Sequence, residues 1–417
     1  MRIKKEIAIL LLLSILNCQS PKPLTKSSLR SPENVDLSSD SLAKMTTYFH
    51  QLVDEKKLAG VQIGILQKEK LVYFDTYGFA DIENNKALEE NSIFRIFSMT
   101  KPIVSVALMQ LYEQEKFQLN DPLHQYIPAF KDAKILQDSA VIPSPTPVRI
   151  IDLLRHTSGY SYGRINNPKL SEYYVQANLN SSTNNKDFVN KLAKIPLQFE
   201  PGTNWQYGLS TNIVGRLVEV LSGNTLDQYL QDHILTPLQM NDTHFQLPKD
   251  KVSRFTVGYR WSEENGLYVS ETADDNRYVR EVTLFNGGGG LVSTTVDYLN
   301  FCQMLLNKGK WNGERILQAE TIDLMLSDHL ETVQPHQAGP LRLPPNEASF
   351  GLGFAIKGDS PDKLQEVFGW GGAVGTYFKI DTKNDLAYVM MIQISPYRHL
   401  GLRSKLQDFV NAAIVKS

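Results

Sequence analysis

The hydrophobic pattern of the chain is strand-like near both ends and helix-like in the middle. Apolar runs bounded by turn residues predict strands, and apolar positions that recur every three or four residues predict helices with one buried face. The predicted strands are 61–66, 71–74, 350–356, 367–372, 376–380 and 386–392, and the predicted helices are 41–55, 98–115, 150–154, 211–221, 302–309 and 400–415.

This order of elements predicts a single α/β (α+β) domain over residues 41–417. Strands from both ends of that range would form one sheet, with a mostly helical part, roughly 115–290, inserted between them. A chain of 417 residues is long enough to bury a large core in this arrangement.

The helix that begins near Ser98 carries the clearest candidate chemistry. Ile103, Val104 and their successors recur at helical spacing, and Pro102 suits a first turn because its missing N–H is not needed there. Lys101 follows Ser98 by three residues, so the two side chains would lie about 60° apart and about 4.5 Å along the axis. The free N–H groups of the helix start favour negative charge at the same place. This stretch predicts a nucleophile, a base and an anion site in one turn.

Spacing alone does not select this pair, because Ser-x-x-Lys also occurs at 41–44 and 360–363. Those two matches fit an N-cap and a polar turn, whereas Ser98 and Lys101 lie in apolar sequence. We expect burial of Lys101 to lower its pKa, and a neutral amine at pH 7 needs a shift of about three units. An N-cap serine with a solvent-directed lysine explains the stretch equally well.

A rival motif lies at 159–163, where Gly-Tyr-Ser-Tyr-Gly matches the Gly-x-Ser-x-Gly nucleophile elbow around Ser161. That elbow requires a buried strand before the serine and a helix after it. Here a predicted helix end precedes Ser161 and a turn follows it. We therefore interpret the segment as a surface loop.

Three further segments are informative without being decisive. Tyr207 lies between the turn 200–204 and a predicted helix start, although one tyrosine of 18 is by default a packing residue. The four glycines at 287–290 lack a phosphate-loop pattern and predict a tight turn or a close backbone approach. The proline-rich segment 334–346 is a candidate loop near a site entrance.

Composition excludes several function classes. The formal net charge is −2, so nothing indicates a nucleic acid as partner. The two cysteines are Cys18, in the N-terminal leader, and Cys302, in an apolar helix, which leaves no intrachain disulfide in a processed chain. The eight histidines show no metal-binding spacing. We expect no metal or other cofactor, and nothing indicates a protein partner.

The first 18 residues are predicted to be a lipoprotein-type signal peptide. Three basic residues precede the apolar run 7–13, which is too short for a comfortable membrane span. The residues before Cys18 resemble a bacterial lipobox, in which the cysteine becomes lipidated, although Asn17 stands where a small residue is usual. Residues 19–40, rich in serine and proline, would form a flexible tether. An ordinary signal peptide or an uncleaved anchor is the alternative. The expected location is the bacterial cell envelope, on the periplasmic or outer-membrane side, with the membrane as partner through a lipid anchor.

Taken together, the motifs resemble the serine β-lactamase/penicillin-binding-protein superfamily. The likeness covers nearly all of 41–417 and is closest to the class C-like esterase branch, the family VIII carboxylesterases. The motifs that carry it are Ser98 to Lys101, the Leu-Leu-x-His-Thr-Ser-Gly segment at 151–159, the glycine-rich strand at 286–294, Tyr207, and Trp370-Gly371-Gly372 in place of Lys-Thr-Gly.

The resemblance implies a β-lactamase/transpeptidase-like fold and acyl transfer without a cofactor. Ser98 would be the acylated nucleophile, with Lys101 and Tyr207 sharing the proton transfers. Trp370, Gly371, Gly372 and Ala373 would line the substrate site, and the N–H groups of Ser98 and Ala373 would hold the oxyanion.

Two departures from the family pattern favour a small-molecule ester as substrate. Leu209 replaces the asparagine of Tyr-x-Asn and Trp370 replaces the lysine of Lys-Thr-Gly. The implied function is therefore a carboxylesterase on short-chain esters. The alternatives are a β-lactamase or D-alanyl-D-alanine peptidase, a non-catalytic envelope binding protein with the same fold, and a hydrolase that uses Ser161.

Overall fold

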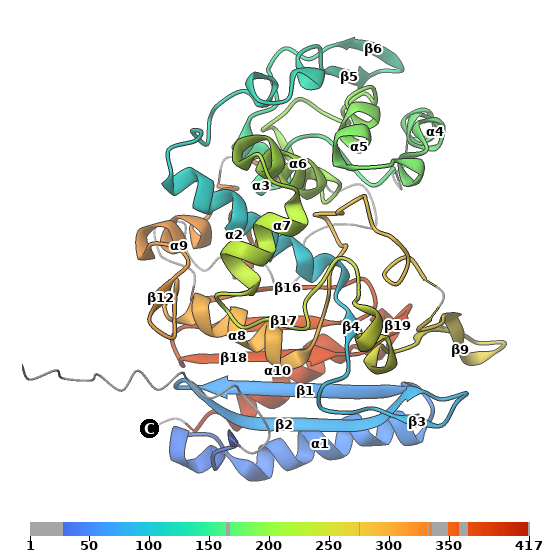
Figure 1. Cartoon of the computed structure of the whole chain (residues 1–417), viewed down its shortest axis with the longest axis vertical. Coiled ribbons are helices and arrows are strands. Elements are labelled where there is room, and N and C mark those ends of the chain that lie inside the picture. Colours follow the sequence, from blue (N-terminus) through green and yellow to red (C-terminus); the bar gives the residue numbers. More distant parts are fainter. Residues whose placement is uncertain are drawn as a thin grey trace, which may run out of the picture.

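The computed structural model describes residues 28–163, 167–274, 276–331, 333–335, 349–357 and 366–415. An eight-stranded sheet forms the base of the molecule, in the order β14-β15-β16-β17-β18-β1-β2-β3 (Figure 1). Its strands are β1 (Gly60–Gln67), β2 (Lys70–Asp81), β3 (Lys86–Ala87), β14 (Ser349–Phe350), β15 (Ala355–Ile356), β16 (Val367–Gly371), β17 (Tyr377–Asp381) and β18 (Leu386–Met391).

The two ends of the chain meet in the middle of this sheet. β1 pairs antiparallel with β2 on one side and with β18 on the other, where Ile63 lies opposite Met390. Every residue of β1 is buried, since helices cover both faces of the sheet. The prediction that strands from both ends form one antiparallel sheet is confirmed.

Two helices cover one face of the sheet and a third covers the other. α1 (Ser39–Asp54) packs against α10 (Leu402–Ala413) on the first face. α8 (Thr295–Leu306) lies on the second face (Figure 1). A Cβ at Gly64 of β1 would meet Leu299 and Thr295, so the absence of a side chain there lets α8 approach the sheet closely.

The helical part stands on the α8 side of the sheet. Its central helices, α2 (Thr100–Glu113) and α6 (Ser210–Ser222), pack against each other, and most of α2 is buried. The other α-helices are α3 (Ile150–Leu154), α4 (Pro168–Ala177), α5 (Asn185–Leu192), α7 (Leu226–Leu230) and α9 (Ala319–Leu326). The remaining strands are β4 (Phe94–Arg95), β5 (Lys134–Gln137), β6 (Ala140–Pro143), β7 (Asn204–Trp205), β8 (Gly258–Ser262), β9 (Gly266–Glu271), β10 (Val292–Ser293), β11 (Lys310–Trp311), β12 (Glu314–Arg315), β13 (Gln334–Pro335) and β19 (Ile394–Ser395).

Two predicted strands are wrong in their extent. The segment 350–356 is not one strand: β14 and β15 form a tight hairpin around Gly353, whose φ of 96° favours glycine. The glycine-rich strand expected at 286–294 is a turn followed by the two-residue β10. In both cases glycines that support a turn occur inside an apolar run.

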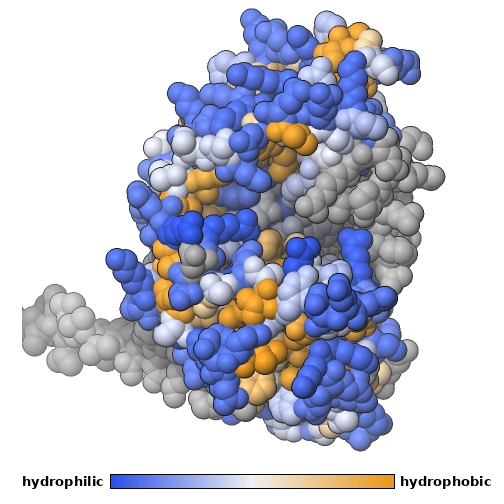
Figure 2. Space-filling view, turned by 90° about the vertical axis from the view of Figure 1, so that its right-hand side faces the viewer, coloured by the Kyte–Doolittle hydropathy of each residue, from blue (hydrophilic) through white to orange (hydrophobic). Residues whose placement is uncertain are grey.

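Several predictions concern residues outside the described ones. The signal peptide, Cys18 and residues 19–27 of the tether lie outside them, and so do all but two residues of the proline-rich segment 334–346. The described part of the tether contradicts the prediction of a flexible segment, because Pro32–Val35 form a 3₁₀ turn, Val35 and Leu37 are buried, and α1 already begins at Ser39. In the described part of the chain, no helix is long and apolar enough to cross a membrane, and no cluster of His, Cys, Asp or Glu could hold a metal ion. The face in Figure 2 is largely hydrophilic, with hydrophobic residues in separate patches.

Candidate active site

Ser98 lies where the chain turns sharply from a strand into a buried helix. β4 ends at Arg95, a single 3₁₀ turn spans Phe97–Met99, and α2 begins at Thr100. Phe97 has a φ of 43°, a left-handed conformation that non-glycine residues adopt rarely and often at functional sites. The prediction that Ser98 precedes a core-facing helix is confirmed.

Lys101 is 2% exposed and donates hydrogen bonds to three oxygens. Its Nζ lies 3.2 Å from Ser98 Oγ and 3.0 Å from the hydroxyl of Tyr162, and it also donates to the carbonyl of Gly288. An ammonium group has three N–H bonds, and a further hydrogen bond to Tyr207 is among the causes that raise the pKa of Lys101. The Nζ also lies 4.8 Å from the ring centre of Tyr207.

The expectation that burial lowers the pKa of Lys101 is wrong. Burial by itself acts in that direction, but Tyr162 and Tyr207 outweigh it, and the pKa of Lys101 lies above its ordinary value. Burial, the largest cause, raises the pKa of Tyr162 to about 12. Hydrogen bonds to the charged form favour that form. Lys101 is therefore an ammonium at rest, beside a neutral phenol of Tyr162.

Tyr207 reaches the same place from the loop between β7 and α6. Its hydroxyl accepts a hydrogen bond of 3.1 Å from Nε1 of Trp370, and the two ring centres are 5.1 Å apart. The ring of His156 lies 4.9 Å away on another side. Tyr207 is 9% exposed, so the surrounding rings fix its position. The structure thus brings Ser98, Lys101, Tyr207 and Trp370 together.

Tyr162 was missed in the sequence, although it lies inside the Gly-x-Ser-x-Gly match. The surface-loop interpretation of that segment is wrong in one respect, because Ser161 is fully buried. Its Oγ accepts the N–H of Gly163, and its own N–H donates to Tyr174. The segment follows α3 and a turn instead of a strand, so it is not a nucleophile elbow. The apolar, aromatic character of the motif was the only available signal for Tyr162.

The turn at 287–290 confirms the predicted close backbone approach. Gly288 presents its carbonyl to Lys101, and a Cβ at Gly288 would collide with the side chain of Asn212. Asn212 donates to Asn286 at 2.8 Å, and Asn286 accepts the N–H of Gly288 at 2.9 Å. The two asparagines therefore fix the carbonyl that holds the ammonium.

The turn between β16 and β17 places Ala373 beside the segment that leads to Ser98. The N–H of Gly372 donates to the carbonyl of Thr376 at 2.8 Å, which closes the turn. Thr376 Oγ donates to the carbonyl of Ile96 at 3.4 Å, and a Cβ at Gly372 would lie 2.6 Å from that same oxygen. Ala373 is exposed at the tip of this turn.

Comparisons with known proteins show the family of this chain. The family model described as Beta-lactamase matches residues 45–408. The protein Rv1367c of Mycobacterium tuberculosis is 30% identical over 83% of this chain and 88% of its own length. The esterase EstB of Burkholderia gladioli is 30% identical over 55% of this chain and 57% of its own length.

A solved structure gives a similar result. EstCE1, described as a hydrolase with promiscuous acyltransferase activity, superimposes with a TM-score of 0.70 at 26% identity. The match covers 88% of this chain and 98% of that protein. The overall fold predicted from the sequence is therefore shown by structural comparison as well as by the sheet topology.

Proposed function

This chain belongs to the Beta-lactamase family of serine hydrolases, and from this premise we propose that it is a carboxylesterase that forms an acyl-enzyme on Ser98. The observation that carries the proposal is the contact between the Ser98 hydroxyl and the buried ammonium of Lys101, 3.2 Å apart. A neighbouring proton-transfer group of this kind is what an alcohol nucleophile requires. Ser161, the rival nucleophile, has no lysine, histidine or carboxylate as a hydrogen-bond partner in the described part of the chain: its Oγ accepts the N–H of Gly163, and its N–H donates to the hydroxyl of Tyr174.

The proton of Ser98 is proposed to pass to the pair formed by Lys101 and Tyr207. At rest Lys101 is an ammonium and Tyr207 a phenol, so the pair must first lose one proton before it can accept the proton of Ser98. The reactive pair is then either a Lys101 amine with a Tyr207 phenol or a Lys101 ammonium with a Tyr207 phenolate, and transfer of one proton between the two residues interconverts these two states. After attack on the ester, the pair returns the proton to the leaving alkoxide. Water then repeats the sequence on the acyl-enzyme.

The oxyanion is proposed to bind the N–H groups of Ser98 and Ala373. Two preorganised donors aimed at a developing negative charge commonly contribute about 10²–10³ in rate each. The bond from Thr376 to the carbonyl of Ile96 supports this role, because it links the turn that carries Ala373 to the strand end before Ser98. In this proposal both the proton transfers and the binding of the oxyanion use side chains and backbone N–H groups of the chain itself.

Short-chain esters fit the proposed site better than β-lactams or peptidoglycan peptides. The single N–H of Trp370 is engaged by Tyr207, so the indole presents an apolar wall where relatives have a lysine. Leu209 is buried and cannot bind an amide. The names of two relatives, esterase EstB and a lovastatin esterase of Penicillium rubens, favour the same class.

Labelling with a fluorophosphonate and peptide mapping tests the proposal. We expect the adduct on the peptide that contains Ser98 and hydrolysis of p-nitrophenyl butyrate by the unlabelled protein. Ser98→Ala should lower kcat by several orders of magnitude, whereas Ser161→Ala, the matched control, should stay within a few fold. An adduct on Ser161, or an Ser98→Ala variant with normal turnover, would refute the proposal.

A further inference from the structure

Arg403, in the first turn of α10, is held against the turn that carries Ala373. Its Nη2 donates to the carbonyl of Gly372 at 2.6 Å and to that of Thr376 at 2.9 Å. The guanidinium carbon lies 4.6 Å from the ring centre of Tyr397 and 5.3 Å from that of Tyr377. The positive charge is therefore fixed in place at the end of β16.

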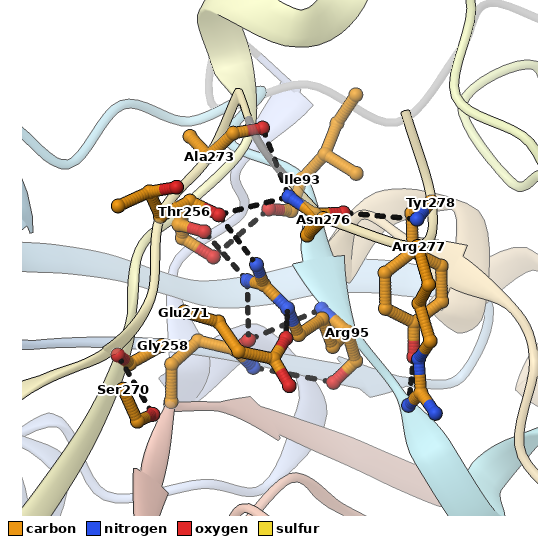
Figure 3. Close-up of polar contacts among 12 residues, drawn as sticks. Ile93, Arg95, Thr256, Gly258, Ser270, Glu271, Ala273, Asn276, Arg277 and Tyr278 are labelled. Atoms are coloured by element: carbon orange, nitrogen blue, oxygen red, sulfur yellow. Dashed lines mark hydrogen bonds and ion pairs between the residues drawn. The ribbon is translucent and has the colours of Figure 1, made fainter. Parts of the chain in front are cut away.

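This charge has no acidic partner in the part of the chain that the structure describes. The Nε of Arg403 is buried without a hydrogen bond, and Nη1 has none to any described residue. Arg95 provides a contrast: its Nε contacts the carboxylate of Glu271 at 2.7 Å, and its other nitrogens donate to carbonyls (Figure 3). Partly buried charges are normally paired, so Arg403 retains the capacity to bind an anion.

Among the described residues, no strand pairs with the edge of β16 next to Arg403. β15 pairs only with Phe368 and Gly369, so Trp370 and Gly371 have no strand partner on that side. The indole of Trp370 extends from one face of the strand toward Tyr207. On the other face, a Cβ at Gly371 would collide with the guanidinium carbon of Arg403. A group that lies along this edge has the indole on one side and the guanidinium on the other.

We propose that Arg403 binds a carboxylate on the alcohol part of the ester, so that the preferred substrates are anionic esters. This inference rests on the proposed function. Tyr207, the proposed proton donor to the leaving oxygen, contacts Trp370, and this places the alcohol part along Trp370 and Gly371. Two residues of extended chain, from Gly371 to Ala373, span at most about 7 Å, so a carboxylate a few bonds beyond the ester oxygen can reach the guanidinium.

Two esters that differ only in charge test this inference. 3-Carboxyphenyl butyrate and 3-carbamoylphenyl butyrate have nearly the same shape, and both release a phenol that is measured by chromatography. We expect the kcat/KM of the wild-type protein to be at least about tenfold higher for the carboxylate, which is the size of effect that a charge-assisted hydrogen bond gives. Arg403→Gln should bring the ratio close to one. The matched control Lys405→Gln, which removes an exposed charge from the same helix, should leave the ratio unchanged.

The outcomes distinguish binding of the substrate carboxylate by Arg403 from a purely structural role of Arg403 in the turn around Ala373. If Arg403→Gln lowers kcat/KM equally for both esters, Arg403 only supports the turn around Ala373 and the inference fails. A wild-type ratio near one also refutes it. If neither ester is hydrolysed, or if hydrolysis does not need Ser98, the proposed function fails instead.

A measurement on the wild-type protein covers the case in which Arg403→Gln does not fold. 3-Hydroxybenzoate should inhibit hydrolysis of p-nitrophenyl butyrate at least about tenfold more strongly than 3-hydroxybenzamide, and the difference should shrink as salt is added. Equal inhibition by the two phenols would contradict the inference.

Discussion

Replacing Tyr162 with phenylalanine removes one atom from the environment of the buried ammonium. The hydroxyl oxygen lies 3.0 Å from Lys101 Nζ, and the rest of the ring packs 5.6 Å from Tyr207 between ring centres. Phenylalanine keeps that packing, so the change isolates the hydrogen bond. We expect the variant to fold.

The size of the effect follows from the charge of the donor. A hydrogen bond to a charged group contributes about 1.5–3 kcal/mol, and Lys101 is 2% exposed, so water cannot readily replace the lost acceptor. Only the part of this bond that strengthens between the free enzyme and the transition state affects kcat/KM, and a gain of that full size corresponds to a decrease of about 10- to 150-fold in the variant. The hydrogen bond that Lys101 donates to Tyr162 is also one of the causes that raise the pKa of Lys101. Its removal lowers that pKa, so the rise of kcat/KM with pH moves to lower pH.

The assay is kcat/KM for p-nitrophenyl butyrate between pH 6 and 10, corrected for spontaneous hydrolysis. Tyr174→Phe is the matched control, since the Tyr174 hydroxyl accepts the N–H of Ser161 and has no contact with Lys101 among the described residues. It should lower stability by about 1 kcal/mol and leave activity within a few fold. Retention of more than half the activity in Tyr162→Phe, with an unchanged pH profile, would refute the reasoning. An equal loss in both variants would show that only the loop structure matters.

Four further predictions concern the site, stability and location. Lys101→Ala and Lys101→Arg should both lose at least about 10³ in kcat while remaining folded, because the arginine stays protonated; more than about a tenth of wild-type activity in Lys101→Arg would show a purely electrostatic role. A p-nitrophenyl ester should be hydrolysed at least about tenfold faster than the lactam ring of a chromogenic cephalosporin is opened, since Leu209 and Trp370 do not bind its amide and carboxylate. Burial raises the pKa of Asp297 to about 7, so the folded state holds more protons than the unfolded state between about pH 4 and 7; stability should fall as pH rises through that window, and calorimetry should show a smaller fall in Asp297→Asn. Cys18→Ser should abolish incorporation of labelled palmitate, and unchanged labelling would contradict the lipid anchor.

The parts of the site that the sequence predicted are those set by local pattern. The apolar spacing after Lys101 and the proline at its start predict where α2 begins. The segment before α6, with a turn and then a helical repeat closed by Gly223, likewise places Tyr207 near a helix start. Such signals lie within about a dozen residues of each other and need no knowledge of the tertiary structure.

The parts that could not be predicted depend on contacts between distant segments. The apolar sequence around Lys101 predicts a lowered pKa, whereas Tyr162 and Tyr207, which are distant in the sequence, raise the pKa of Lys101. Arg403 is separated from Gly372 by 31 positions and meets it only because α10 packs below the sheet. No pattern near Arg403 indicates that contact.

The buried ammonium of Lys101 needs several hydrogen-bond acceptors, and a four-residue motif cannot supply all of them. An ammonium buried to the extent of Lys101 is unfavourable by several kcal/mol unless its donors are satisfied. Its acceptors come from three separate segments: Ser98 precedes α2, Tyr162 follows α3, and Gly288 lies in the turn before β10. The charged pair that the proposed chemistry needs can form only when these segments are packed together. At the match 41–44, by contrast, Lys44 is exposed and pairs with Asp40 of the same helix at 2.7 Å, so its charge needs no buried acceptors. This difference explains why the same four-residue pattern predicts chemistry at Ser98 and ordinary surface structure at Ser41.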